Sequence, residues 1–175
     1  MRWQQLIIGT YQRMSRELEE VLKGLTTEDL HQRPAPGANP IGWLCWHATR
    51  SMDRTLGDVI KGEQLWIKDG WHKKFNRAPD PNDTGYGHTD AQVDALRIPD
   101  VQTLLAYRRA VMAVTLKYLE NLTEKELDRE CEYSVEPGAK RAASLRIIAN
   151  INDLQHVGQA AYVRGLIKGH RWSGR

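Results

Sequence analysis

Four long stretches of the chain carry apolar residues at helical spacing, and this pattern constrains the fold more than any other feature. In the first stretch, apolar positions recur at steps of three and four from Trp3 to Leu25, which is the pattern of one face of an amphipathic helix. No alternation of strands with helices and no sustained strand pattern is present. We therefore predict an all-α fold, a four-helix bundle formed by a single domain over 1–175. The four predicted helices cover about 3–25, 40–61, 100–122 and 144–168.

The connection between the second and third predicted helices differs from the rest of the chain. It runs from Gly62 to Asp100, is rich in Gly, Pro and Asn, and keeps weak helical character only around 63–71. A connection of this length inside a compact domain is unusual and is often functional. We expect it to lie over one end or side of the bundle. A brief extended segment is also expected around 131–135, before a turn at Pro137 and Gly138.

Composition excludes several classes of protein. Hydrophobic residues make up 41% and charged residues 27% of the chain, as in ordinary globular proteins. No apolar run approaches the 18 residues or so of a membrane span, and the first residues lack a signal-peptide cleavage site, so we expect a cytoplasmic protein with no membrane partner. The net charge of +3 is spread out and forms no basic stripe of the kind that binds nucleic acid.

The fourth predicted helix carries two polar residues on an otherwise apolar face. Asn152 and His156 are four residues apart and so lie on the same side of a helix, while Asp153 lies three residues before His156. A buried polar group without a partner costs about 1–3 kcal/mol. These side chains therefore need each other, another helix, water or an ion.

The second predicted helix offers a partner for His156. His47 lies at the border of its apolar stripe, and Arg50 and Asp53 follow at steps of three. The latter two are most simply a surface ion pair, worth about 0.3–0.5 kcal/mol. Helices packed about 8–10 Å apart would bring His47 and His156 onto one ion. Imidazole is a ligand of zinc, nickel, iron and manganese. The competing interpretation is that each histidine is a hydrogen-bonded core residue.

The third metal ligand is left open by the sequence. The helical position four residues before His156 is Asn152, and a neutral amide is a poor zinc ligand. The alternatives are His88, Asp153 and Asn152 through its carbonyl oxygen. We favour His88, because the glycines just before it, Gly85 and Gly87, allow its loop to approach an ion closely.

Two segments resemble a known protein family. The segment 39–50, which reads NPIGWLCWHATR, resembles the second-helix motif of the DinB-like (YfiT-type) metalloprotein superfamily. The segment 155–165, which reads QHVGQAAYVRG, resembles its fourth-helix motif. The helix order agrees, so the resemblance covers nearly the whole chain. The middle segment, from 63 to 88, is similar to the branch related to mycothiol-dependent transferases.

The resemblance implies a four-helix bundle with a divalent metal held by three histidines, and many members are dimers. His47 and His156 match two of the metal ligands, and Asn152 takes the place of the third. We therefore expect a divalent metal, zinc or nickel before iron or manganese, and a homodimer. Several members join a low-molecular-weight thiol to an electrophile, which suggests a thiol cosubstrate here.

The expected function is that of a metal-dependent S-transferase, acting in detoxification on a small-molecule electrophile. A metal that binds the sulfur lowers the pKa of the thiol, so that a thiolate is present at neutral pH. Tyr86, Arg108 or His88 would then stabilise the charge that develops on the substrate. The alternative is a non-catalytic bundle that binds a metal or a small ligand. A regulatory module that contacts nucleic acid through the basic tail is a weaker third interpretation.

Overall fold

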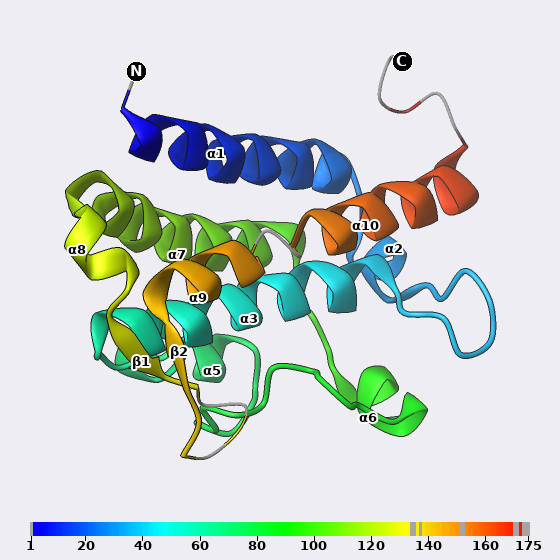
Figure 1. The fold of residues 1–175 in the computed structure, drawn as a ribbon. Helices are drawn as coiled ribbons and strands as arrows, with labels where there is room; N and C mark the ends of the chain where they lie inside the picture. The colour runs from blue at the N-terminus through cyan, green and yellow to red at the C-terminus, as the bar shows by residue number, and fades with distance from the viewer. Residues whose placement is uncertain (1, 134–135, 137, 151–152, 170–171, 173–175) are drawn as a thin grey trace.

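The computed structural model has four long helices arranged as a bundle (Figure 1), and it describes residues 2–133, 136, 138–150, 153–169 and 172. Helix α1 (Trp3–Leu22) packs against α7 (Val101–Asn121) and α10 (Asp153–Lys168), and α3 (Ile41–Ile60) packs against the same two helices. Each long helix therefore has two long neighbours. The all-α bundle expected from the sequence is confirmed.

Shorter elements complete the described part of the chain. Helix α2 begins with a capping box, in which Thr26 and Asp29 bond to each other's backbone N–H groups; such boxes satisfy N–H groups that a helix start leaves without partners. A two-stranded antiparallel sheet forms where a brief extended segment was expected, pairing Cys131 with Arg141. These elements are α2 (Thr27–His31), α4 (Leu65–Lys68), α5 (Trp71–Lys74), α6 (Asp90–Ala95), α8 (Glu124–Leu127), β1 (Glu130–Glu132), β2 (Lys140–Ala142) and α9 (Ala143–Ala149).

Helix α3 forms the centre of the molecule. Sixteen of its twenty residues are buried, which is far more than the single apolar face of an amphipathic helix would bury. It is covered by α7 and α10 and also by α2, α4, α9 and β1. Gly42 permits one of these contacts, because a Cβ there would lie 2.7 Å from the Leu30 carbonyl oxygen. Side chains on several faces of α3 can therefore take part in a buried site.

The long connection is held to α3 by a buried arginine. The Arg50 guanidinium donates hydrogen bonds to the backbone carbonyls of Asp80, Pro81 and Asp83, and it lies 4.6 Å from the centre of the Trp66 ring. The prediction of a surface ion pair is wrong, since both Arg50 and its partner on the same helix, Asp53, are almost fully buried. The sequence did not reveal this because the covering segment comes from a different part of the chain.

Asp53 joins three elements through its carboxylate. It accepts hydrogen bonds from the backbone N–H groups of Leu65 and Trp66 at 2.9 and 2.7 Å, and from the Tyr107 hydroxyl at 2.7 Å. The first two bonds satisfy the free N–H groups at the start of α4. Helices α3, α4 and α7 are thus fixed to one another beside the long connection.

The fourth predicted helix corresponds to two elements in the structure. Helix α9 ends at Ala149 and α10 begins at Asp153, and residues 151 and 152 lie outside the described part of the chain. None of the helices among the described residues is both long and apolar enough to span a membrane.

Candidate functional site

His47 and His156 come together although they are far apart in the sequence. His47 lies on α3 and His156 on α10, and their rings meet edge to face with centroids 4.7 Å apart and planes 81° apart. The two helices pack against each other along this region. The structure therefore brings together the two histidines that the helical spacing singled out.

The orientation of His47 is set by the long connection and by a tryptophan. Its Nδ1 lies 2.5 Å from the backbone carbonyl oxygen of Thr84, and the Trp43 ring stacks on it with centroids 4.8 Å apart. A carbonyl oxygen only accepts hydrogen bonds, so Nδ1 carries the proton and Nε2 has the free lone pair. Metal-binding histidines are commonly held in this way, with one ring nitrogen donating to a carbonyl and the other left for the ion.

His156 has the same tautomer for a similar reason. Its Nδ1 lies 2.9 Å from the side-chain oxygen of Gln159; this oxygen accepts a hydrogen bond from Nδ1–H, which leaves the lone pair on Nε2. Two imidazoles that bind one zinc ion at about 2.0–2.1 Å have ring centroids roughly 4.5–5.5 Å apart. The 4.7 Å separation of His47 and His156 is within this range. The pair therefore fits two ligands of a divalent metal.

Electrostatics also favour a neutral His47. Burial lowers the pKa of His47 to about 4, and the charges of His156 and Arg54 act in the same direction, against the hydrogen bond to Thr84. A ring with this pKa is unprotonated at neutral pH. A neutral imidazole is the form that binds a metal, because coordination needs the lone pair.

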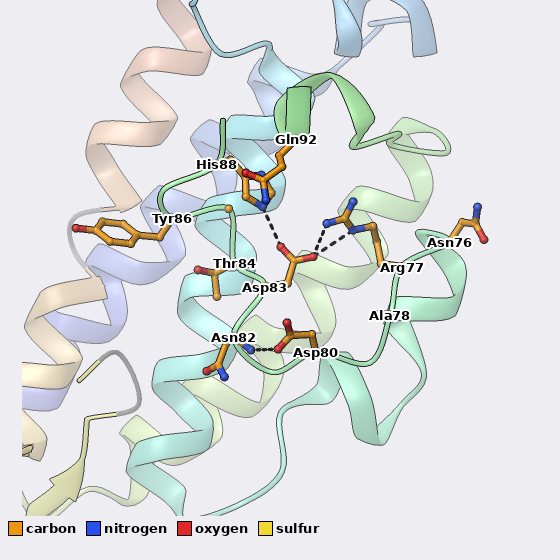
Figure 2. Close-up of a pocket in the computed structure, with 11 residues that line it drawn as sticks. Asn76, Arg77, Ala78, Asp80, Asn82, Asp83, Thr84, Tyr86, His88 and Gln92 are labelled. Atoms are coloured by element: carbon orange, nitrogen blue, oxygen red, sulfur yellow. Dashed lines mark hydrogen bonds and ion pairs between the residues drawn. The ribbon is translucent and has the colours of Figure 1, made fainter. Parts of the chain in front are cut away.

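His88 lies close to His47 but has different partners. Its Nδ1 accepts a hydrogen bond from the Trp43 indole N–H at 3.2 Å, and its Nε2 donates to Asp83 at 3.1 Å. Figure 2 shows the Asp83 carboxylate between His88 and Arg77. Both ring nitrogens of His88 are thus occupied, and in this arrangement the ring supports Trp43 and hence His47.

The other candidate ligands are placed as follows. Asp153 is buried at the start of α10 and accepts a hydrogen bond from Arg108 at 3.1 Å. Burial raises the pKa of Asp153 to about 6, against the opposing effect of Arg108. Asn152 lies outside the described residues. Among the residues that are described, no group of three His, Cys, Asp or Glu side chains is arranged to hold a metal.

A cavity of about 230 Å3 opens beside the two histidines, and we call it the histidine pocket. Tyr86 lines it and is 80% exposed, whereas Arg108 is fully buried and reaches the pocket through Asp153. The lining residues are His47, Ser51, Arg54, Thr55, Tyr86, Tyr133, Arg146, Ala149, Asn150, Asp153 and His156. A second, larger cavity of about 550 Å3 lies among residues 76–92 and shares only Tyr86 with the first (Figure 2).

Arg54 and Arg146 belong to the histidine pocket but were not among the sequence candidates. Helical spacing could have indicated Arg54, because residues 47, 51, 54 and 55 follow the spacing of one helix face. Arg146 gave no such signal. It comes from α9, which follows β2 directly and packs against α3.

Gly85 allows the long connection to approach the site. Its backbone has φ +90°, and a Cβ there would lie 3.0 Å from Trp43, 3.1 Å from Trp46 and 3.2 Å from Nδ1 of His47. The sequence suggested that the glycines beside His88 serve a close approach. The structure shows that this approach delivers the Thr84 carbonyl to His47.

The chain matches known proteins over most of its length. The model of the DinB superfamily matches residues 10–160. A conserved protein from Enterococcus faecalis has a solved structure that is 28% identical, with a TM-score of 0.84 over 97% of this chain and 99% of that chain. A DinB-like protein from Bacillus cereus ATCC 10987 is 18% identical, with a TM-score of 0.60 over 90% of this chain and 87% of that one, and supports the fold. No match was found among curated proteins.

Proposed function

The chain belongs to the DinB superfamily, and we propose that it is a metal-dependent enzyme that transfers a small thiol to a small electrophile. The observation that carries the proposal is the His47–His156 pair. The rings are 4.7 Å apart, and each Nδ1 is bonded to an oxygen, so both Nε2 lone pairs are available to an ion. When bound, a divalent metal, zinc or nickel before iron or manganese, lowers the pKa of a coordinated thiol so that the thiolate exists at neutral pH.

The residues of the chain prepare the site for this reaction. Thr84 and Trp43 fix the orientation and tautomer of His47, and Arg108 holds the Asp153 carboxylate at the pocket wall. We propose Tyr86, whose exposed side chain lines the pocket, as a hydrogen-bond donor to substrate. In the transfer, the thiolate sulfur forms a bond to an electrophilic carbon, the leaving group departs with its electron pair, and the thiol proton passes to solvent.

Metal content tests this proposal directly. Elemental analysis of purified protein is expected to find a divalent metal in the wild type and much less of it in His47→Ala and His156→Ala. His72→Ala is the matched control, because His72 is also buried and also has Nδ1 bonded to a backbone carbonyl but lies outside the histidine pocket. Metal at wild-type stoichiometry in both site variants would rule out these ligands.

A non-catalytic bundle that binds a metal or small ligand is the second candidate. It is favoured by the ligand set, since no group of three metal-binding side chains is found among the described residues. A thiol-transfer screen with several small thiols and electrophiles, with and without added metal, separates the two. Metal binding without transfer in every combination would favour the second candidate.

We also propose that the chain forms a homodimer, as the family resemblance implies. A cavity of about 500 Å3 between α1 and α10 has a largely apolar lining that includes Leu154, Val157 and Ala161, and Leu6 and Tyr162 are exposed on the same two helices. A second copy of the chain would cover this face. Light scattering should give twice the 20.0 kDa chain mass, and Leu154→Glu should restore the single mass. A wild-type mass of 20.0 kDa at micromolar concentration would contradict the dimer.

A further inference from the structure

Arg54 is a half-buried cation that faces the histidine pocket. It lies seven residues after His47 on α3, which is about 10 Å along the helix axis on the same face. Its Nε is inaccessible to solvent and has no hydrogen-bond partner among the described residues. Buried N–H groups almost always bond to an acceptor, so this Nε–H is suited to a partner that enters the pocket.

The nearest carboxylate on the same helix is already engaged. Asp58 lies one turn after Arg54 and bonds to Nη2 of Arg146 at 2.8 Å. Burial lowers the pKa of Arg54, and although Asp58 opposes this effect, Arg146 and Arg50 add to it. The charge of Arg54 is therefore only partly compensated by the protein.

Arg146 contributes a second, fixed positive charge to the pocket wall. Its side chain is buried, and its Nη2 donates hydrogen bonds to the Thr55 hydroxyl at 3.2 Å and to the Asp58 carboxylate. Its guanidinium lies 4.6 Å from the centre of the Tyr133 ring, and its Nε also lacks a partner among the described residues. A cation fixed in this way makes the electrostatic potential of the pocket more positive, while its hydrogen bonds keep it from moving to another partner.

The remaining ionisable groups at the pocket do not cancel this charge. Asp153 is paired with Arg108 at 3.1 Å, so its carboxylate does not offset the charge of Arg54. One carboxylate, Asp58, is thus set against two guanidinium groups, Arg54 and Arg146. The surplus is about one positive charge, which suits a ligand with a single negative charge.

The size of the pocket restricts the ligand further. Its volume of about 230 Å3 is below the 300–1,000 Å3 or so of sites for drug-sized ligands. A planar guanidinium matches a carboxylate through two parallel hydrogen bonds. The Asp153 carboxylate also lines the pocket and repels a dianion such as phosphate more than a monoanion, which makes a monoanion the better match.

We propose that the histidine pocket recognises a small carboxylic acid, whose carboxylate binds the Arg54 guanidinium and whose other end lies toward His47 and His156. As a statement about substrate class, this inference rests on the proposed function, because the acid would be the electrophile or the thiol. Binding of the acid to Arg54 does not require a bound metal. A failure of carboxylate binding can therefore be distinguished from a failure of the proposed metal-dependent transfer.

The test measures binding of butyrate to protein from which metal has been removed with a chelator. Calorimetric titration should show saturable binding of butyrate, and weaker binding of butyramide, which has nearly the same shape but no charge. Arg54→Gln should weaken butyrate binding about tenfold or more, as expected for a lost charge-assisted bidentate contact, and Arg54→Lys should give an intermediate affinity.

Arg109→Gln is the matched control. Arg109 is an exposed arginine of α7 paired with Glu19, and its replacement should leave butyrate binding unchanged. Equal affinity of the wild type and Arg54→Gln, equal affinity for butyrate and butyramide, or no saturable binding by the wild type would each overturn the proposal. Tighter binding of inorganic phosphate than of butyrate would overturn the choice of a monocarboxylate. A finding that His47 and His156 do not bind metal, by contrast, would contradict only the proposed function and not the binding of butyrate.

Discussion

Replacing Gly85 by alanine tests how the long connection controls the histidine site. The residue has φ +90°, and an added Cβ would lie 3.0–3.2 Å from Trp43, Trp46 and His47. The positive φ costs about 1–3 kcal/mol for a residue with a side chain. Relief of the close contacts requires the loop to move outward, which stretches the bond from His47 to the Thr84 carbonyl and adds about 1–3 kcal/mol if the donor is left unsatisfied.

The total for Gly85→Ala is therefore about 2–6 kcal/mol of unfolding free energy, which lowers Tm by roughly 4–24 °C for a chain of this size. Gly87→Ala measures the cost of the positive φ alone, since Gly87 has φ +75° and nothing lies within 4 Å of the added Cβ. The difference between the two variants then gives the cost of the close contacts at Gly85. Urea denaturation of chelator-treated protein, followed by tryptophan fluorescence, gives both values.

Metal affinity supplies a second measurement for the same pair of variants. Loss of the hydrogen bond that orients a ligating histidine typically weakens metal binding by about 10–100-fold, so Gly85→Ala should bind metal more weakly and Gly87→Ala should not. If the two variants had equal stability and equal metal affinity, the close approach of the loop to His47 would have no energetic role, and the reasoning would be refuted.

Three further predictions concern buried charges. Asp153→Asn leaves the Arg108 charge unpaired in the core and should lower the unfolding free energy by about 3–5 kcal/mol; a loss below about 1 kcal/mol in urea denaturation would contradict this. The pKa of His47 is about 4 in the folded protein, below the ordinary histidine value of 6.5, so the unfolded chain binds the proton first as pH falls. The wild type should therefore lose about 3 kcal/mol relative to His47→Gln between pH 6.5 and pH 4, and a constant difference in metal-free protein would be inconsistent with it. Arg50→Met removes the bonds to the carbonyls of residues 80, 81 and 83, and limited proteolysis of that segment should become about tenfold faster, while an unchanged rate would show that other contacts hold it.

The sequence predicted the long helices well because their burial follows a local period. The predicted stretches 40–61 and 100–122 agree with α3 and α7 to within one or two residues. The stretch 144–168 was predicted as one helix, and the structure describes helices α9 and α10 within it, with residues 151 and 152 outside the described part of the chain. Helix α6 escaped notice although Thr89 and Gln92 form a capping box, since its six residues are too few for a periodic pattern.

Helical spacing also located His47, His156 and Asp153, because each lies on a helix whose neighbours fix its direction. The position of Arg54 could be predicted by the same argument, continued two turns beyond His47. The burial of Arg50 could not be predicted from helical spacing. Whether a polar residue on a helix meets solvent or another part of the chain depends on contacts between distant segments, and here the backbone of 80–83 supplies its acceptors.

The role of the segment around His88 shows why sequence reasoning selects side chains and overlooks backbone. A histidine flanked by glycines suggested a ligand, since glycines allow close approach and imidazole binds metals. The close approach is present, but Gly85 has no side chain and the group it brings to His47 is the carbonyl of Thr84. Every residue has a carbonyl, so no residue type marks the one that orients the ring. His88 acts one step further away, by accepting a hydrogen bond from the Trp43 indole that stacks on His47. The His47 orientation therefore depends on the backbone of this loop, and changes at Gly85 should alter the site as strongly as changes at many of its lining residues.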